Sequence, residues 1–320
     1  MTLAQLPKIS SDCQPLVQKP GYDYDLVIVG GGIIGLTLAA ALNDSGLRIL
    51  LIEARVQSAS VAKGQAYAIH MLSALIYQGI GIWDKILPQI ETYNRVRLSD
   101  ADFSGVVEFN TSDIGSQDLG YVAEHQALLY PLQELVKDSP SITYLCPAEV
   151  ISTEYLEDVA TVEVKIAGEI CQIRSHLVVA ADGGKSRIRQ AAGIKTRGWK
   201  YWQSCIVAFV KPEKYHNNTA YEKFQSSGPF AILPLPENRC RIVWTAPHDE
   251  AKALLELDDD QFLAQLQKRF GDQMGELELL GDRFIFPVQL MQSNRYVLNR
   301  LTIISEAAQK CHPDRRQGLN

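Results

Sequence analysis

The chain has 320 residues, of which 46% are hydrophobic and 21% are charged, a composition typical of a folded protein with a sizeable core. Its net charge of −6 and isoelectric point near 5.6 argue against a nucleic-acid-binding protein, which would need a basic face. No apolar run approaches the roughly 18 residues that a membrane-spanning helix needs. Residues 1–22 are polar and mixed, without a signal-peptide pattern, and we interpret them as a flexible tail.

The reactive residue types exclude two further classes of protein. The six cysteines form no CxxC pair, so we expect reduced thiols in a cytoplasmic protein. The six histidines lack the spacing of a zinc site, and no nucleophile elbow accompanies a Ser–His–Asp set. The sequence therefore predicts neither a metal site nor a hydrolase.

The first strong pattern lies between Tyr24 and Arg55. An apolar run at 25–29 ends in glycine, residues 33–43 have a helical pattern, and a second apolar run covers 48–53. A strand, a helix and a strand within about 30 residues predict a βαβ unit with parallel strands.

A glycine pattern lies between the first strand and the helix of this unit. Gly30, Gly32 and Gly35 match GxGxxG, whose glycines allow a tight turn, close approach of a pyrophosphate and close packing of the helix on the strand. Glu53 ends the second strand about 20 residues after Gly32, where a carboxylate accepts hydrogen bonds from a ribose. An ordinary glycine turn would explain the glycines alone, but not the whole unit. We therefore expect a dinucleotide site with phosphates near Ile33, and the pattern leaves FAD and NAD open.

The rest of the chain mixes helical and strand patterns. Helices are predicted at 73–86, 126–136 and 261–270, and we interpret the acidic residues 258–260 as an N-terminal cap of the last helix rather than a metal site. The predicted strands cover 143–151, 159–173, 177–181, 205–210, 230–235 and 239–245. This order favours an α/β nucleotide-binding domain with an inserted, β-sheet-rich domain.

A second motif follows the predicted strand at 177–181. Asp182 and Gly183 end the strand, and Ser186 and Arg189 follow. The spacing resembles the DGxxSxxR motif of the flavoprotein aromatic hydroxylases, the group that includes para-hydroxybenzoate hydroxylase. An ordinary Asp-Gly turn is the alternative, but it does not account for the serine and arginine. In that family the motif lies near both FAD and NAD(P)H, so the resemblance implies FAD as cofactor and NAD(P)H as co-substrate.

A third motif, within 300–320, resembles the second flavin motif of the same family, GDAAHxxHPxxGQGxN. Pro313, Gly318 and Asn320 match it, with Leu319 at its variable position. The match establishes a resemblance from Tyr24 to the end of the chain. The family continues into a long helix, so we expect this chain to be shortened at its end.

Four positions depart from that third motif. Ser305 replaces a glycine, Glu306 an aspartate, Gln309 a histidine and Arg316 a glycine. The family's aspartate bonds the ribityl chain of FAD, so the resemblance gives this role to the longer Glu306. Arg316 places a bulky cation where glycine lets the backbone approach the flavin. These differences predict weak FAD binding by the chain.

Further segments narrow the resemblance to the ubiquinone-biosynthesis hydroxylases. They lie at 64–69, where Gln65 replaces the family's arginine, and at 120–125, 228–236 and 243–245. The resemblance implies a Rossmann-like FAD-binding domain with an inserted, β-sheet-rich substrate domain. The FAD-binding domain would comprise 23–75, 104–195 and 285–320, and the substrate domain would comprise 76–103 and 196–284.

The resemblance implies an FAD-dependent monooxygenase that uses NAD(P)H and O2 to hydroxylate an aromatic ring. A prenylated phenol or quinone precursor would be the substrate, with transient membrane contact by an otherwise cytoplasmic protein and no nucleic acid partner. Two alternatives stay open, a non-catalytic relative with weakened FAD binding and a prenyl reductase on the same fold.

No catalytic side chain is singled out, because the cofactor carries the difficult chemistry. Gln126, the first residue of the predicted helix that follows the 120–125 segment, is included among the candidate cofactor-binding residues. The expected cofactor-binding residues are Gly30, Gly32, Ile33, Gly35, Glu53, Ala54, Arg55, Gln65, Gln126, Asp182, Gly183, Ser186, Arg189, Glu306, Pro313, Gly318, Leu319 and Asn320.

Overall fold

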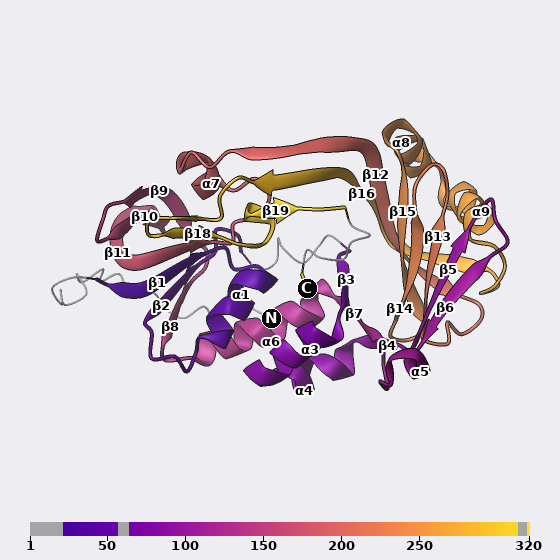
Figure 1. Cartoon of the computed structure of the whole chain (residues 1–320), viewed down its shortest axis with the longest axis horizontal. Helices are drawn as coiled ribbons and strands as arrows, with labels where there is room; N and C mark the ends of the chain where they lie inside the picture. The colour runs from indigo at the N-terminus through magenta and orange to yellow at the C-terminus, as the bar shows by residue number, and fades with distance from the viewer. Residues whose placement is uncertain (1–21, 57–63, 313–318) are drawn as a thin grey trace.

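The computed structural model describes residues 22–56, 64–312 and 319–320. Its strands form three sheets, with helices packed on the first two (Figure 1). The α-helices are α1 Ile33–Ala41, α3 Met71–Ile80, α4 Trp83–Ile86, α5 Thr111–Ile114, α6 His125–Asp138, α7 Arg187–Ala191, α8 His248–Glu256 and α9 Asp259–Phe270. Two 3₁₀ turns, η1 Leu87–Gln89 and η2 Ser305–Ala307, complete the helical elements of the described residues.

The first sheet is built around parallel strands. Its spatial order is β17 Val297–Leu298, β18 Leu301–Ile303, β11 Glu169–Ala180, β1 Tyr24–Val29, β2 Ile49–Ile52 and β8 Ile142–Leu145. Strand β1 precedes helix α1 in the chain and strand β2 follows it, and the two strands pair in parallel. This arrangement confirms the predicted βαβ unit. Strands β9 Glu149–Tyr155 and β10 Ala160–Ile166 extend from β11 as an antiparallel meander.

Both faces of β1 and β2 are buried. Ile28 and Leu51 belong to one core cluster with helices α1 and α6, and Val27 and Leu50 belong to another beneath the β9–β11 meander. All four side chains are completely inaccessible to solvent. Burial on both faces explains why these strands read as continuous apolar runs rather than as alternating patterns.

The second sheet is mainly antiparallel. Its order is β19 Gln309–Lys310, β16 Leu277–Ser293, β12 Thr196–Pro212, β15 Arg239–Pro247, β14 Phe230–Leu235, β13 Thr219–Phe224, β5 Arg95–Asp100 and β6 Val106–Asn110. The long strands β12 and β16 run from beside the first sheet to the far part of the second sheet (Figure 1). Helices α8 and α9 cover one face through a core that includes Ile242, Trp244 and Phe262. As interpreted, Asp258 caps α9 by accepting a 2.8 Å hydrogen bond from the Gln261 amide.

A third, small sheet packs against both of the other two. It consists of β3 Ala66–Ile69, β7 Gly120–Glu124 and β4 Glu91–Tyr93. Its residues Ala66 and Val122 share a core cluster with Leu233 and Leu235 of the second sheet. This packing fixes the second sheet in position relative to the nucleotide-type unit.

The sheets divide the chain differently from the domain boundaries expected above. Tyr77, Ile82 and Ile86, which fall in the expected substrate segment 76–103, pack in the core of α1 and α6. Strand β6, in the expected FAD-binding segment 104–195, pairs with β5 of the second sheet. Division by packing therefore assigns α3 and α4 to the first unit and β5 and β6 to the second.

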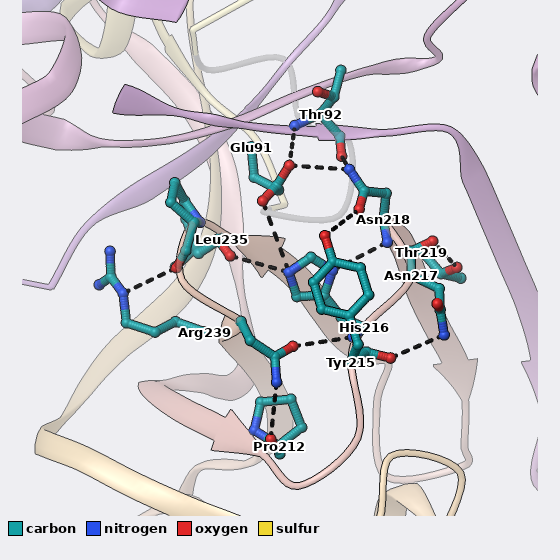
Figure 2. Close-up of polar contacts among 12 residues, drawn as sticks. Glu91, Thr92, Pro212, Tyr215, His216, Asn217, Asn218, Thr219, Leu235 and Arg239 are labelled. Carbon is teal, nitrogen blue, oxygen red and sulfur yellow. Dashed lines mark hydrogen bonds and ion pairs between the residues drawn. The ribbon is translucent and has the colours of Figure 1, made fainter. Parts of the chain in front are cut away.

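A buried histidine ties the third sheet to loops of the second (Figure 2). The ring of His216 is 1% exposed, donates from Nε2 to the Leu235 carbonyl at 3.1 Å, and accepts at Nδ1 from the Asn218 amide at 3.1 Å. The Asn218 side chain donates to Glu91 at 3.0 Å and to the Thr92 carbonyl at 2.8 Å. Every polar atom of the ring is satisfied in the neutral form, so we interpret His216 as a structural residue.

Acid should weaken this junction. Burial lowers the pKa of His216 below its ordinary 6.5, so the folded chain binds this proton less readily than the unfolded chain. Its contribution to stability is present above pH 6.5 and is lost as the pH falls through the folded-state pKa. Urea unfolding at pH 7 and at pH 5 should show a smaller acid loss in His216→Gln, which keeps a donor and an acceptor but cannot become charged. An equal loss in both proteins would contradict this role.

Candidate functional site

A large cavity lies where the three sheets meet. Its volume is about 1360 Å³, above the roughly 300–1000 Å³ common for single small-molecule sites. One wall is the carboxyl ends of β1, β2 and β11, the edge at which parallel α/β sheets bind ligands. Strand β3 and the open face of the second sheet form the other walls. The cavity therefore has space for a dinucleotide and a second ligand.

The glycines of the first motif have three different surroundings. Gly30 has φ +114°, and a Cβ there would overlap the carbonyl of Ala181 at the end of β11. A Cβ at Gly35 would overlap the carbonyl of Gly30, so the helix packs directly on the turn. A Cβ at Gly32 would meet nothing within 4 Å and would point into open space. Gly30 and Gly35 thus allow close packing of backbone against backbone, and Gly32 leaves room for a ligand.

Gly32 is also the N-terminal cap of α1. It makes no side-chain cap, so the amides of the first turn, from Ile33 onward, have no partner from a capping side chain. Unpaired amides and the positive end of the helix dipole favour an anion such as a pyrophosphate.

Glu53 is held at the end of β2 by two backbone amides. Its Oε2 accepts from Gly31 at 2.7 Å, and its Oε1 accepts from Arg55 at 2.8 Å. An ionised carboxylate has about four lone-pair sites, so each oxygen can accept one further hydrogen bond. The half-buried carboxylate therefore links the glycine loop to β2 and still offers acceptors to ribose hydroxyl groups.

Removing this carboxylate should weaken cofactor binding. Glu53→Ala removes the ribose acceptor, and FAD affinity should fall by about 1–3 kcal/mol. Flavin fluorescence titration of the apoprotein measures the change, with Glu154→Ala, an exposed carboxylate on β9, as the control. Affinity equal to the parent's would show that Glu53 does not bind the ribose.

Asp182 lies directly across the turn from Gly30. Among the residues that the structure describes, its Oδ2 receives only a long 3.4 Å hydrogen bond from the Ile188 amide, and its buried Oδ1 has no partner. A buried carboxylate oxygen normally has a hydrogen-bond donor. This oxygen is thus an acceptor that a hydroxyl group of a bound dinucleotide can satisfy.

Ser186 and Arg189 lie beneath the motif loop rather than at the cavity wall. Ser186 caps α7 by accepting from the Arg189 amide at 2.9 Å. The guanidinium of Arg189 donates to the Ala307 carbonyl at 2.9 Å and to the Gly184 carbonyl at 3.0 Å. It therefore joins the loop of the second motif to η2 of the third, and both residues act through positioning.

Residues of the third motif line the cavity, and Glu306 and Asn320 among them form polar contacts. Glu306 faces Gly184 and forms a 3.6 Å ion pair with Lys310, four residues later. Asn320 accepts from the His70 amide at 2.9 Å and from the Ser73 hydroxyl at 2.8 Å, and it donates to the Ala68 carbonyl at 2.9 Å. The end of the chain is thus joined to the junction of β3 and α3.

The structure brings most of the expected cofactor residues to one cavity. Those that line it are Gly30, Gly32, Ile33, Gly35, Glu53, Ala54, Arg55, Gln65, Asp182, Gly183, Glu306, Leu319 and Asn320. Gln126 is exposed and lines a separate, smaller hollow beside His125. Pro313, Arg316 and Gly318 lie outside the described residues.

Several polar residues of the cavity were not among the expected site residues, including Tyr67, His125 and Arg241. The Tyr67 hydroxyl lies 3.0 Å from Gln65 Oε1 and 2.9 Å from His125 Nδ1. Burial raises the pKa of Tyr67 to about 12 and lowers that of His125, so both are neutral near pH 7. Arg241 lines the opposite wall, on β15. Its position in a largely apolar strand was the available signal, because arginine is seldom placed among buried residues without a partner.

Comparison with known proteins places the chain in a family. The FAD binding domain family matches residues 23–320. An uncharacterised Synechocystis protein, slr1300, is 44% identical over 93% of this chain and 72% of that protein. The ubiquinone hydroxylase UbiL of Rhodospirillum rubrum is 34% identical over 92% of this chain and 69% of its own length. The 3-demethoxyubiquinol 3-hydroxylase of Escherichia coli is 30% identical, over 92% and 76%.

The chain belongs to the FAD-dependent monooxygenases. The fold of this monooxygenase agrees with that assignment. PqsL of Pseudomonas aeruginosa, a probable FAD-dependent monooxygenase, superposes with a TM-score of 0.77 at 19% identity, over 93% of this chain and 82% of that one. The flavin-dependent monooxygenase PieE, solved with FAD and substrate, gives 0.76 at 19% identity, over 93% and 55%. The prediction of an α/β, Rossmann-like FAD-binding fold is confirmed.

Proposed function

We propose that this chain hydroxylates an electron-rich aromatic ring, as a member of the ubiquinone-hydroxylase type. The reaction would convert the ring, O2, NAD(P)H and a proton to the hydroxylated ring, water and NAD(P)+. A prenylated phenol or quinone precursor is the proposed substrate. The observation that supports this proposal is the continuity of one cavity from the nucleotide motifs to the mostly apolar face of the second sheet.

The residues present fit FAD. The amides at the start of α1 would hold the pyrophosphate and Glu53 a ribose. Asp182 Oδ1, which has no hydrogen-bond partner among the described residues, would accept from another hydroxyl group. Open space at Gly32 allows the backbone to approach the phosphates. When bound, FAD supplies the redox chemistry between a nicotinamide and O2.

The protein's own part in the reaction is positioning and exclusion of water. Val207, Leu233, Val243 and Phe286 line the cavity wall on the second sheet. Such a wall holds a ring through apolar contact and keeps bulk water from the reacting atoms. No side-chain nucleophile is needed for this chemistry, which agrees with the absence of an acid–base pair in the motifs.

A prenylated substrate would be stored in a membrane, so we include transient membrane contact in the proposal. Within the described part of the chain, no helix is both long and apolar enough to cross a membrane. Co-sedimentation with liposomes that carry a prenylated phenol tests this contact, and liposomes without the phenol are the comparison.

The proposed reaction is tested with the whole chain loaded with FAD. NADH or NADPH oxidation and O2 uptake should both rise with a phenol that carries an apolar tail, and isotopically labelled O2 should appear in the ring. Reduction of a prenyl double bond without oxygen incorporation would favour the alternative of a reductase. Failure to bind FAD would favour the non-catalytic alternative.

A further inference from the structure

Arg241 is a cation on the wall of the cavity that faces the substrate side. Side chains alternate along β15, so Ile242 and Trp244 enter the core beneath α8 and α9, whereas Arg241 and Val243 point to the opposite face. Arg241 pairs across the sheet with Leu233 of β14 and Phe209 of β12. The guanidinium therefore projects from an otherwise apolar part of the sheet.

This guanidinium has no hydrogen-bond or ion-pair partner among the described residues, and its Nε is fully buried. Two other arginines of the second sheet and its helices have such partners. Arg239, two residues earlier on the same face, forms a 2.7 Å ion pair with Glu124, and buried Arg269 donates to the Gly228 carbonyl at 2.7 Å. Arg241 as a whole is half-buried, so its charge is partly removed from water without a compensating partner, and this position favours an anionic ligand.

The titratable groups around Arg241 do not supply that anion. Burial lowers the pKa of Arg241 to about 10, and nearby Tyr67 and Cys205 raise it only in part, so the side chain is charged at neutral pH. Tyr67 is neutral, with its pKa raised to about 12. Glu306 pairs with Lys310.

Glu222 is the other carboxylate of this sheet face. It stands two strands away on β13, in the row of Val243 rather than that of Arg241. Its charge is not among those that raise the pKa of Arg241, which come from Tyr67 and Cys205.

The surroundings indicate which anion fits. Val207, Ala231, Leu233 and Phe286 suit an aromatic ring, and a planar guanidinium suits an oxygen anion carried by that ring. We infer that Arg241 binds an anionic oxygen on the aromatic substrate, a phenolate or a carboxylate, and so sets the orientation of the ring. This inference rests on the proposed function for the identity of the substrate. A phenolate held here would also be richer in electrons than the phenol, which favours hydroxylation.

Equilibrium binding tests this assignment without turnover. The probe is 4-nitrophenol, because its phenolate is coloured and its ionisation on the protein can be read directly. The FAD-loaded parent should bind the phenolate and lower the pKa of the bound probe by about 1–2 units, the effect of a nearby opposite charge. Arg241→Met should abolish that shift and weaken phenolate binding at least tenfold, whereas Arg241→Lys should keep part of both.

Control ligands separate the effect of the ligand's charge from that of its shape, and they identify the preferred anionic group. Nitrobenzene, which lacks the oxygen, should bind parent and Arg241→Met equally. Benzoate weakened more than 4-nitrophenol by Arg241→Met would identify a carboxylate as the preferred group, and the reverse would identify a phenolate. Equal phenolate affinity in parent and variant, or loss of FAD with unchanged probe binding, would overturn the assignment.

Stability provides an independent readout. Replacing a half-buried cation that has no partner among the described residues by methionine should leave the thermal midpoint of the apoprotein unchanged or raise it. Arg239→Met, which breaks the ion pair to Glu124, should lower that midpoint and leave the pKa shift of the bound probe intact. A large stability loss in Arg241→Met would show a structural role and contradict the proposal. Phenolate binding without hydroxylation would contradict the proposed function and leave the role of Arg241 standing.

Discussion

Gly35→Ala is expected to destabilise the chain by about 3 kcal/mol or more, because the new methyl group would overlap the carbonyl oxygen of Gly30. The carbonyl oxygen is a backbone atom and the methyl group is attached directly to Cα, so neither can rotate away. Helix α1 would have to move off β1, and the core that contains Leu36 and Ala39 would open. Thermal unfolding of the apoprotein should show a midpoint lower by roughly 6 °C or more.

Gly32→Ala is the matched control and should have the opposite pattern. Gly32 has φ −74° and ψ 177°, which any residue adopts, and a Cβ there meets no atom within 4 Å. The variant should lose about 1 kcal/mol of stability at most, from a less favourable helix cap. Its FAD affinity should nevertheless fall at least tenfold, because the methyl group occupies the space through which the pyrophosphate approaches.

These two variants together locate the phosphate site. Loss of stability in Gly35→Ala and loss of FAD affinity in Gly32→Ala would separate the packing glycine from the binding glycine. Parent-like FAD affinity in Gly32→Ala, measured by fluorescence titration, would show that the phosphates bind elsewhere. A stable Gly35→Ala protein would show that α1 can shift away from the turn.

Arg189→Met is the second change with a large expected effect. The guanidinium is 6% exposed and holds the carbonyls of Ala307 and Gly184, so its loss leaves a buried carbonyl without a donor and separates the two motif loops. We expect a loss of about 3 kcal/mol in the free energy of unfolding and weaker FAD binding. Arg189→Lys should be intermediate, because one ammonium cannot serve both carbonyls in the same geometry.

The same helix provides the control. Arg187 is 81% exposed and pairs with Glu149 on the surface at 2.7 Å, so Arg187→Ala should change stability by about 0.5 kcal/mol or less. Urea unfolding followed by tryptophan fluorescence compares the variants. Equal effects of Arg187→Ala and Arg189→Met would show that the buried bridge contributes nothing beyond a surface charge.

The sequence by itself determined the nucleotide-binding unit. The glycines, the apolar strands and the end-of-strand Glu53 act over short distances along the chain, and each pattern has a direct consequence for backbone geometry or burial. Residues whose role depends on near neighbours in the chain could therefore be interpreted from the sequence. Asp258, which caps helix α9, is an example. The resemblance in the Asp182–Arg189 motif predicted FAD as the cofactor. It did not predict the division of the motif into residues that line the cavity and residues that support the loop.

Only the tertiary structure decided that division. Ser186 and Arg189 look like ligands in the sequence, yet they support the loop, because the partner of Arg189 lies at Ala307, more than a hundred residues away. Domain membership was equally hidden at β6, whose partner strand is set by long-range pairing in the second sheet.

The role of Arg241 depends on the same kind of information. Alternation along β15 predicts that Arg239 and Arg241 share a face, but nothing local shows that Glu124 reaches one and no described residue reaches the other. Periodicity specifies which side chains share a face of a strand, whereas the fold specifies what that face meets. For this reason the cofactor motifs could be found in the chain, whereas the position of Arg241 on the cavity wall required the assembled sheets.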